Sequence, residues 1–385
     1  MNGRPPIYLD YNATTPLDGD VRSDLLEALD SSWANPSSVH RLGRHARAML
    51  DEARDQVAGL WRCRPGEVVF TSGGTEANNL AVLGAARSRR SRGRHLLCSP
   101  LEHPAVRECH EFLARHEGFE LEYLPVDRRG WIDPGAVRDR LRKETALVSL
   151  MAANNEIGTL QPVAEVGRIC REQGVLFHTD AVQWFGKLPV DGIACFEADL
   201  VTCCAHKLHG PKGAGALYVR SPLQLVPVQL GGSHEHDRRA GTENLAAVSG
   251  LVSALRRFCT PPVFPEATLR QLRDRLAGAF HELPGVEVVA EGSERLPNTV
   301  AVTVEGADSI ALLAALDLEG VCASSGSACS SGSLEPSRVL TAMGFPDARA
   351  ASLVRFSLGR ETTEAEIEVV CGLAPVVVGR VRGAG

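Results

Sequence analysis

The stretch VLFHTDAVQ at residues 175–183, followed further along by AHK at residues 205–207, decides how we interpret this chain. Its apolar start predicts a buried strand that ends at Asp180, and a second apolar run over residues 198–203 predicts a strand that leads into Lys207. In open α/β sheets, ligands bind outside the carboxyl ends of the strands. The two stretches therefore predict that a carboxylate and a lysine face one ligand site.

This pair of side chains fits one cofactor in particular. A lysine that forms a Schiff base and an acid that pairs with a pyridinium nitrogen are the protein's part of pyridoxal 5′-phosphate (PLP) chemistry. A surface lysine and a helix-capping aspartate occur at the same places in many α/β folds. Asp180 and Lys207 alone therefore leave both interpretations open.

Strands and helices alternate on both sides of this pair. Over residues 67–220 the pattern predicts a mostly parallel sheet with helices on both faces, and hence an α/β fold. The run TPPVFP at residues 260–265 predicts a domain boundary. Beyond it, a second, smaller α/β lobe is expected from helices at 266–283, 309–318, 337–343 and 364–381 and strands at 286–290, 299–304 and 353–358.

A Gly-rich turn, TSGGTE at residues 71–76, lies between a predicted strand at 67–70 and a predicted helix at 77–87. Backbone N–H groups and the helix dipole at such a turn attract a phosphate, and Thr75 adds a hydroxyl. The stretch matches neither the P-loop nor the dinucleotide fingerprint. In isolation, a tight turn with Thr75 as the helix N-cap explains it equally well.

Two further polar stretches follow predicted strands. His103 comes after the strand at 95–98 and directly before Pro104, a residue that suits the first turn of a helix. The strand at 146–151 leads into NNEIG at residues 154–158. A lone histidine is often structural, so the position of His103 leaves its role open.

One thiol stands in a run of small residues, SSGSACSSGS at 324–333. Such a run cannot pack a core, so Cys329 is expected on a mobile, wet loop, where it can act as a nucleophile if its pKa is lowered. A small-residue turn with an incidental cysteine is the alternative. Arg355 lies in the apolar strand VRFSL and needs a buried anionic partner, either a substrate carboxylate or a structural ion pair.

The composition is that of a large globular protein of 385 residues, 44% hydrophobic and 23% charged, with a net charge of −6. No long basic run favours nucleic acid, no signal peptide is visible, and no apolar stretch approaches the roughly 20 residues that span a bilayer. The 11 cysteines are scattered without zinc spacing, which predicts free thiols in a reducing cytoplasm. His234, His236 and Asp237 also lack metal-site spacing, so no resident metal is expected.

Taken together, these motifs resemble the cysteine desulfurases, the NifS/IscS-like PLP enzymes of the class V aminotransferase family, and the NifS type in particular. The resemblance covers nearly the whole chain. The motifs that carry it are YLDYNATTP (8–16), TSGGTE (71–76), EHPAV (102–106), NNE (154–156), HK (206–207), GPKG (210–213), RAGT (239–242), SSGSAC (324–329), LEPS (334–337) and RFSLGR (355–360).

The resemblance implies a fold and a domain division. The fold is the PLP-dependent fold type I, similar to aspartate aminotransferase. A large PLP-binding domain is implied over residues 16–258. Residues 1–15 and 259–385 are implied to form a small domain, which carries the catalytic-cysteine loop at about 322–335.

The resemblance also implies the role of each site residue. Lys207 would carry PLP, Asp180 would pair with the pyridinium nitrogen, and His103 would stack on the ring and move protons. Arg355 would bind the carboxylate of L-cysteine, with Asn155 beside it. Cys329 would take the substrate sulfur as a persulfide while L-alanine leaves, and it could transiently ligate an iron–sulfur cluster. The residues implied to hold the cofactor are Gly74, Thr75, Asn155, Asp180, Gln183, Cys204, Ala205, His206, Lys207 and Thr242, the last reaching the phosphate of a neighbouring subunit.

The implied partners are L-cysteine, a second copy of the chain in a homodimer, and a sulfur-acceptor or iron–sulfur scaffold protein in the cytoplasm, with neither nucleic acid nor membrane. The implied pathway is iron–sulfur cluster assembly, with nitrogenase maturation as one branch of it. The alternatives are a selenocysteine lyase, a desulfurase serving tRNA or DNA sulfur modification, an aminotransferase, and a non-catalytic iron–sulfur scaffold. Cys204 departs from the family's usual serine, and Trp184 and Phe185 stand where small residues are common. We expect the first to loosen PLP slightly and the other two to reshape the dimer edge or the pocket wall.

Overall fold

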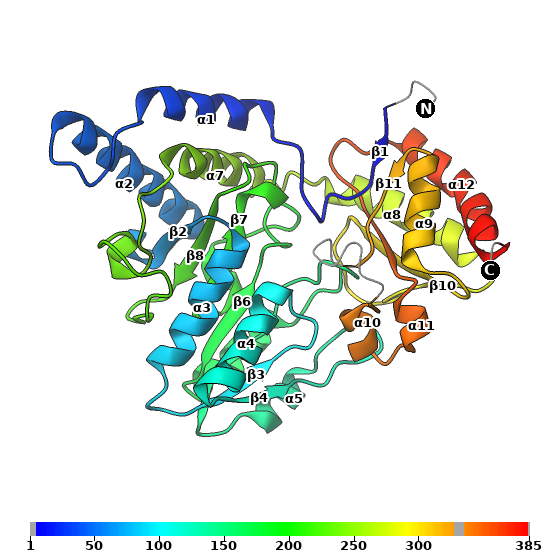
Figure 1. Cartoon of the computed structure of the whole chain (residues 1–385), viewed down its shortest axis with the longest axis horizontal. Coiled ribbons are helices and arrows are strands. Elements are labelled where there is room, and N and C mark those ends of the chain that lie inside the picture. The colour runs from blue at the N-terminus through cyan, green and yellow to red at the C-terminus, as the bar shows by residue number, and fades with distance from the viewer. Residues whose placement is uncertain (1–4, 327–334, 384–385) are drawn as a thin grey trace.

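The computed structural model describes residues 5–326 and 335–383, and its strands form separate sheets in two lobes (Figure 1). The larger lobe holds a seven-stranded sheet in the order β2-β8-β7-β6-β5-β3-β4. Its pairs are parallel except at β8, which is antiparallel to both neighbours. The predicted α/β fold with a mostly parallel sheet is therefore confirmed. The strands are β2 (Val68–Thr71), β3 (His95–Cys98), β4 (Glu120–Tyr123), β5 (Thr145–Ser149), β6 (Leu176–Asp180), β7 (Leu200–Cys204) and β8 (Gly215–Val219).

Helices cover both faces of this sheet because alternate strand residues point to opposite sides. Val68 and Phe70 belong to the apolar cluster that contains α2, α6 and α7, whereas Val69 packs with α3 and α4. The central strands are buried throughout, as continuous apolar runs predict. The helices of this lobe are α1 (Gly19–Ser31), α2 (Arg41–Trp61), α3 (Gly74–Ser88), α4 (Pro104–Glu117), α5 (Pro134–Arg140), α6 (Val163–Glu172) and α7 (Leu245–Phe258).

The smaller lobe is built from both ends of the chain. An antiparallel sheet, β12-β10-β9, packs against α8, α9 and α12, while β1 pairs in parallel with β11. Leu9 and Tyr11 from the N-terminal segment are buried in this core, which agrees with the implied small domain, although its exact limits stay a prediction. The elements are β1 (Ile7–Tyr8), α8 (Glu266–His281), β9 (Val286–Val288), β10 (Thr299–Val304), α9 (Ser309–Leu318), β11 (Val321–Cys322), α10 (Arg338–Ala342), α11 (Asp347–Ala350), β12 (Val354–Ser357) and α12 (Glu364–Gly383).

The structure differs from the sequence pattern in a few elements. Helix α3 begins at Gly74 rather than at residue 77, because Gly73 takes a conformation that a non-glycine residue rarely adopts (φ 153°) and serves as the N-cap. The edge strand β4 was not predicted, since its sequence ELEY carries two glutamates, one of them exposed, in place of an apolar run. Within the described ranges, no helix combines the length and the apolar character that crossing a membrane requires.

A buried ion pair anchors the segment between β8 and α7 to the sheet. Arg54 of α2 donates to both carboxylate oxygens of Glu235 at 2.7 and 2.8 Å, and one of these oxygens also accepts from the N–H of Phe70 at 2.8 Å. The two side chains are 6% and 0% exposed. Glu235, His236 and Asp237 all have positive φ angles (49°, 57° and 62°). The pair therefore holds a strained turn in place.

We predict that Arg54→Ala lowers the thermal unfolding temperature by several degrees. The substitution leaves the Glu235 carboxylate buried without its cation, which costs about 3–5 kcal/mol. Arg47→Ala, in the same helix, removes an exposed pair with Asp51 (50% and 49% exposed). It should cost less than about 0.5 kcal/mol. Calorimetry of both variants tests this, and equal losses would show that the Arg54–Glu235 pair is not the anchor.

Candidate active site

A cavity lies where β5, β6 and β7 end, between the two lobes. Its walls come from the turns after these strands, the first turns of α3 and α4, the N-terminal segment and β12. This is the edge of the sheet at which Asp180 and Lys207 were predicted to meet. The structure brings ten of the predicted site residues together there, namely Gly74, Thr75, His103, Asn155, Asp180, Gln183, Cys204, His206, Lys207 and Arg355.

Two predicted residues do not line this cavity, and a third falls outside the described residues. Ala205 is fully buried in the turn after β7, and its N–H already donates to the carbonyl oxygen of Ala214 at 3.1 Å. Thr242 is exposed, in the segment before α7. Cys329 lies in residues 327–334, outside the described part of the chain.

Asp180 is the last residue of β6 and is held from two sides. One carboxylate oxygen accepts from the side-chain amide of Asn78 at 2.7 Å, and the other accepts from the N–H of Val182 at 3.0 Å. The side chain is almost fully buried. These two donors fix the orientation of the carboxylate, which is what a partner for a ring nitrogen requires.

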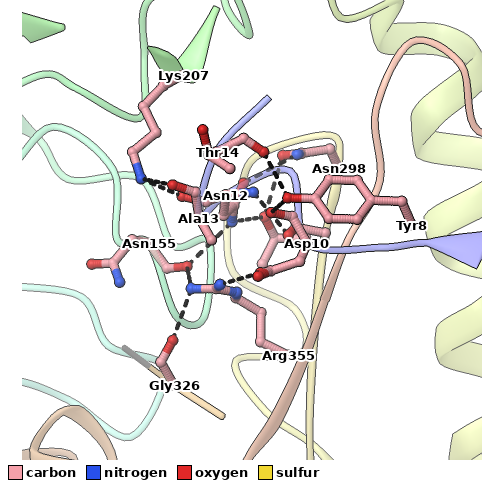
Figure 2. A network of polar contacts seen from close by, with 12 residues as sticks. Tyr8, Asp10, Asn12, Ala13, Thr14, Asn155, Lys207, Asn298, Gly326 and Arg355 are labelled. Atoms are coloured by element: carbon pink, nitrogen blue, oxygen red, sulfur yellow. Dashed lines mark hydrogen bonds and ion pairs between the residues drawn. The ribbon is translucent and has the colours of Figure 1, made fainter. Parts of the chain in front are cut away.

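Lys207 follows β7 and reaches across to the N-terminal segment. Its Nζ donates to the carbonyl oxygens of Asn12 (2.7 Å) and Ala13 (2.6 Å) (Figure 2). Burial lowers the pKa of this amine, and the nearby Arg355 lowers it further. A lowered pKa increases the fraction of free amine at neutral pH, and the free amine is the form that attacks an aldehyde.

The two histidines of the cavity are neutral at neutral pH. His103 is the N-cap of α4, where its Nδ1 accepts from the N–H of Ala105 at 3.1 Å, and burial lowers its pKa although Asp180 acts in the opposite direction. Burial, with Lys207 next to it, lowers the pKa of His206 to about 4. A neutral imidazole can accept a proton, whereas an imidazolium cannot.

The first turn of α3 provides an anion site. The N-cap is Gly73, which makes no side-chain hydrogen bond, so the alternative of Thr75 as N-cap is wrong. A Cβ atom on Gly74 would lie 3.0 Å from Cγ2 of Val182, which explains why glycine stands at this wall. The free N–H groups of the first turn and the dipole of a helix of 15 residues favour an anion at this end of the cavity.

Arg355 forms the structural ion pair that was one of its two alternatives, and its role toward a substrate carboxylate stays a prediction. The side chain is 1% exposed and pairs with Asp10 at 2.6 Å, and it also lines the cavity. Its Nη1 donates to the carbonyl oxygens of Asn155 (3.0 Å) and Gly326 (2.8 Å), as Figure 2 shows. These contacts therefore hold the guanidinium rigidly at the side of the cavity that β12 forms.

The departures from the family pattern have different consequences. Cys204 ends β7 and lines the cavity, and burial raises the pKa of its thiol to about 11, so it is a neutral, weak donor. Phe185 is fully buried, and the centre of its ring lies 5.8 Å from that of Trp61. The ring centres of Trp184 and Phe196 are 5.6 Å apart. The rings of Phe185 and Trp184 belong to the core of the larger lobe, so the expectation that they reshape the pocket wall is wrong.

Two polar residues of the cavity were missed. Asn12 receives hydrogen bonds from Lys207 and from Gln183 on its carbonyl oxygen (2.7 and 3.0 Å). Asn78 orients Asp180 from one turn inside α3. The polar turn after β1 was a local signal for Asn12, but nothing local indicates its contacts with the distant strands.

The comparisons with known proteins agree with this geometry. The family model described as Aminotransferase class-V matches residues 7–370. The chain belongs to this family. A protein named cysteine desulfurase IscS from Dictyoglomus turgidum is 41% identical over 377 residues, which cover 98% of this chain and 95% of the relative.

Solved structures of class V members have the same fold. A structure named NifS-like protein has a TM-score of 0.89 at 32% identity and covers 97% of this chain and 100% of its own. Another, SspA in complex with cysteine, has a TM-score of 0.81 at 32% identity and covers 93% and 100%. The resemblance drawn from the motifs is confirmed, and so is the fold type.

The family depends on PLP, so the predicted cofactor is confirmed. The cavity also fits it by its own chemistry. It offers a buried lysine with a lowered pKa, a carboxylate held by two donors, and the start of a helix where N–H groups are free. These are the three groups that bind the aldehyde, the ring nitrogen and the phosphate of PLP.

We predict that Asn78→Ala weakens PLP binding on the order of tenfold, because Asp180 loses a hydrogen bond to its charged group and with it a fixed orientation. Titration of the apo-protein with PLP, followed by the visible absorption band, measures this. Asn79→Ala is the matched control, since the neighbouring Asn79 donates only to backbone oxygens of Thr75 and Ala105. Equal affinities for the parent and Asn78→Ala would contradict the role of Asn78.

Proposed function

We propose that this chain is a PLP-dependent cysteine desulfurase, which converts L-cysteine to L-alanine and passes the sulfur to Cys329 and then to an acceptor protein. The observation that supports it best is the cavity at which Lys207, Asp180, His103 and Arg355 converge. The relatives named cysteine desulfurase and the structural neighbour that was solved with cysteine support the same reaction.

Bound PLP withdraws electrons from the substrate carbons toward its ring nitrogen. Asp180 would keep that nitrogen protonated, because its carboxylate is fixed by Asn78 and Val182 at the end of β6. His103 is neutral and lies at the start of α4. It can therefore take a proton from the substrate and return it to carbon. Lys207 supplies the amine that attaches the cofactor.

The phosphate end is proposed at the first turn of α3. Gly74 and Thr75 would give N–H groups and a hydroxyl, and neutral His206 would give a ring N–H. The backbone of Cys204 and Ala205 lies beside them. Thr242 is exposed and outside the cavity of its own chain, which fits the proposal that it reaches the phosphate of the other subunit in a homodimer.

Arg355 would bind the carboxylate of L-cysteine, with Asn155 beside it. The guanidinium already holds an anion, Asp10, and two backbone oxygens. One of those oxygens belongs to Gly326, the residue directly before the segment that carries Cys329. Ser324 is also paired with Arg355 through both backbone hydrogen bonds (3.1 and 2.7 Å). The start of the cysteine segment is thereby anchored at the cavity wall.

The transfer of sulfur from the substrate to Cys329 needs no further oxidant or reductant. The thiolate of Cys329 attacks the sulfur of the substrate, an S–S bond forms, and the C–S bond breaks. The electron pair of that bond passes to carbon, which takes a proton to become the methyl group of alanine. The outer sulfur of the persulfide on Cys329 then passes to an acceptor. Because relatives carry the name IscS, we propose an iron–sulfur scaffold as that acceptor.

We predict that Cys329→Ala abolishes sulfide and alanine formation from L-cysteine in the presence of a thiol reductant, while the visible PLP band stays. Cys195→Ala, which removes an exposed thiol from the turn before β7, should retain the activity of the parent. Sulfide and alanine are measured in the same reactions. If Cys329→Ala turns over like the parent, Cys329 is not the nucleophile. If the parent itself is inactive on L-cysteine and active on L-selenocysteine, the lyase alternative replaces the desulfurase.

A further inference from the structure

A second lysine lies behind the cavity and has no part in the chemistry above. Lys187 is fully buried, in the turn that follows β6. Its Nζ donates to Oδ1 of Asn12 at 2.9 Å and to Oε1 of Gln183, and it lies 5.5 Å from the centre of the Phe264 ring. Lysine is seldom fully buried without a charged partner, so this position needs an explanation.

Burial, with Lys207 and Arg355 nearby, lowers the pKa of the Lys187 amine well below its usual range, and its partners are all neutral. In the described part of the chain they are two amide oxygens and an aromatic ring. The charged or titratable groups that face it are Lys207 and Cys204 at the end of β7, and Arg355 on β12. No carboxylate among the described residues forms an ion pair with it, so its burial does not serve a salt bridge.

The Nζ of Lys187 donates to two amide oxygens, and these two hydrogen bonds fix the orientation of each amide. Because Lys187 occupies Oε1 of Gln183, the Nε2 of Gln183 points to the other side, where it donates to the carbonyl oxygen of Asn12 at 3.0 Å. That same oxygen accepts from Lys207. Gln183 therefore presents an N–H group, not a carbonyl oxygen, beside Lys207.

Asn12 is fixed in the same way. Its Oδ1 accepts from Lys187 and from Asn298 (3.1 Å), which leaves its Nδ2 to donate to the carbonyl oxygen of Asn155 (3.2 Å) and to Thr299 (2.9 Å). One buried amine thus decides the direction of two amides that both line the cavity.

We propose that Lys187 is a positioning residue that acts through Gln183 and Asn12. It keeps the N–H of Gln183, and not its side-chain oxygen, beside the cofactor lysine. The proposal rests on the proposed function only in that PLP attaches to Lys207. Without the hydrogen bond from Lys187, the amide of Gln183 is free to turn its oxygen toward Lys207, which favours the protonated, non-attacking amine.

The test is the pH dependence of PLP attachment to the apo-protein, followed by the visible absorption band. Lys187→Met keeps the length of the side chain and removes the donors. We expect the midpoint of the rate profile to move upward by about half a unit to one unit, because a turned Gln183 favours the protonated Lys207. Lys143→Met, which removes an exposed lysine, should leave the midpoint unchanged.

A merely structural role gives a different result. It would lower the thermal unfolding temperature of Lys187→Met without moving the midpoint, and that outcome overturns the proposal. If Lys187→Met does not fold, Lys187→Leu, which also removes the donors, takes its place, with the same upward shift expected and an unchanged midpoint as the contrary result.

A double variant tests the route through Gln183. Gln183→Leu combined with Lys187→Met should shift the midpoint by less than the sum of the two single shifts, because the two side chains act as one unit. Additive shifts would show that Lys187 does not act through Gln183.

Failure of the parent apo-protein to bind PLP at all would instead refute the proposed function, so the two failures are distinguishable.

Discussion

The backbone and side chain of Asn12 form the contact on which the rest of the site depends. Its carbonyl oxygen accepts from Lys207 and Gln183 of the larger lobe, and its own N–H donates to the hydroxyl of Ser357 on β12 at 2.9 Å. The side chain bonds to Asn298 and Thr299 as well. Because Asn12 follows the N-terminal strand of the smaller lobe, a single buried residue sets where the sheet edge of one lobe meets the other. The position of Arg355 relative to Lys207 depends on this contact (Figure 2).

Charge in the cavity is arranged around this contact. Arg355 is a buried cation, burial lowers the pKa of the Lys207 and Lys187 amines, and it also keeps His103 and His206 neutral. Such a cavity attracts a phosphate and a carboxylate and at the same time disfavours protonation of the amine that must react. Asp180 at the cavity wall and Asp10 beside Arg355 are each held by hydrogen bonds. The same positive surroundings therefore favour both the binding of anions and the reactive, free-amine form of Lys207.

The sequence predicted the residues that mark the ends of buried strands, and the structure shows why. Asp180 and Lys207 follow apolar runs that could only be central strands, so their shared edge was determined by the parallel order of the sheet. The start of α3 was placed three residues too late because a glycine N-cap leaves no side-chain signal. Asn12 and Lys187 were out of reach for a different reason. Their contacts join residues 171 and 175 positions apart, and no local period records such a pairing.

The most direct test of this account is the site at which PLP attaches. Borohydride reduction of the PLP-loaded protein fixes the cofactor to its lysine, and mass spectrometry of the peptides then locates it. The account predicts the label on Lys207 and on none of the other three lysines, Lys143, Lys187 and Lys212. A label on Lys187, the other buried lysine, or on no lysine at all would contradict the assignment of the cavity and the chemistry derived from it.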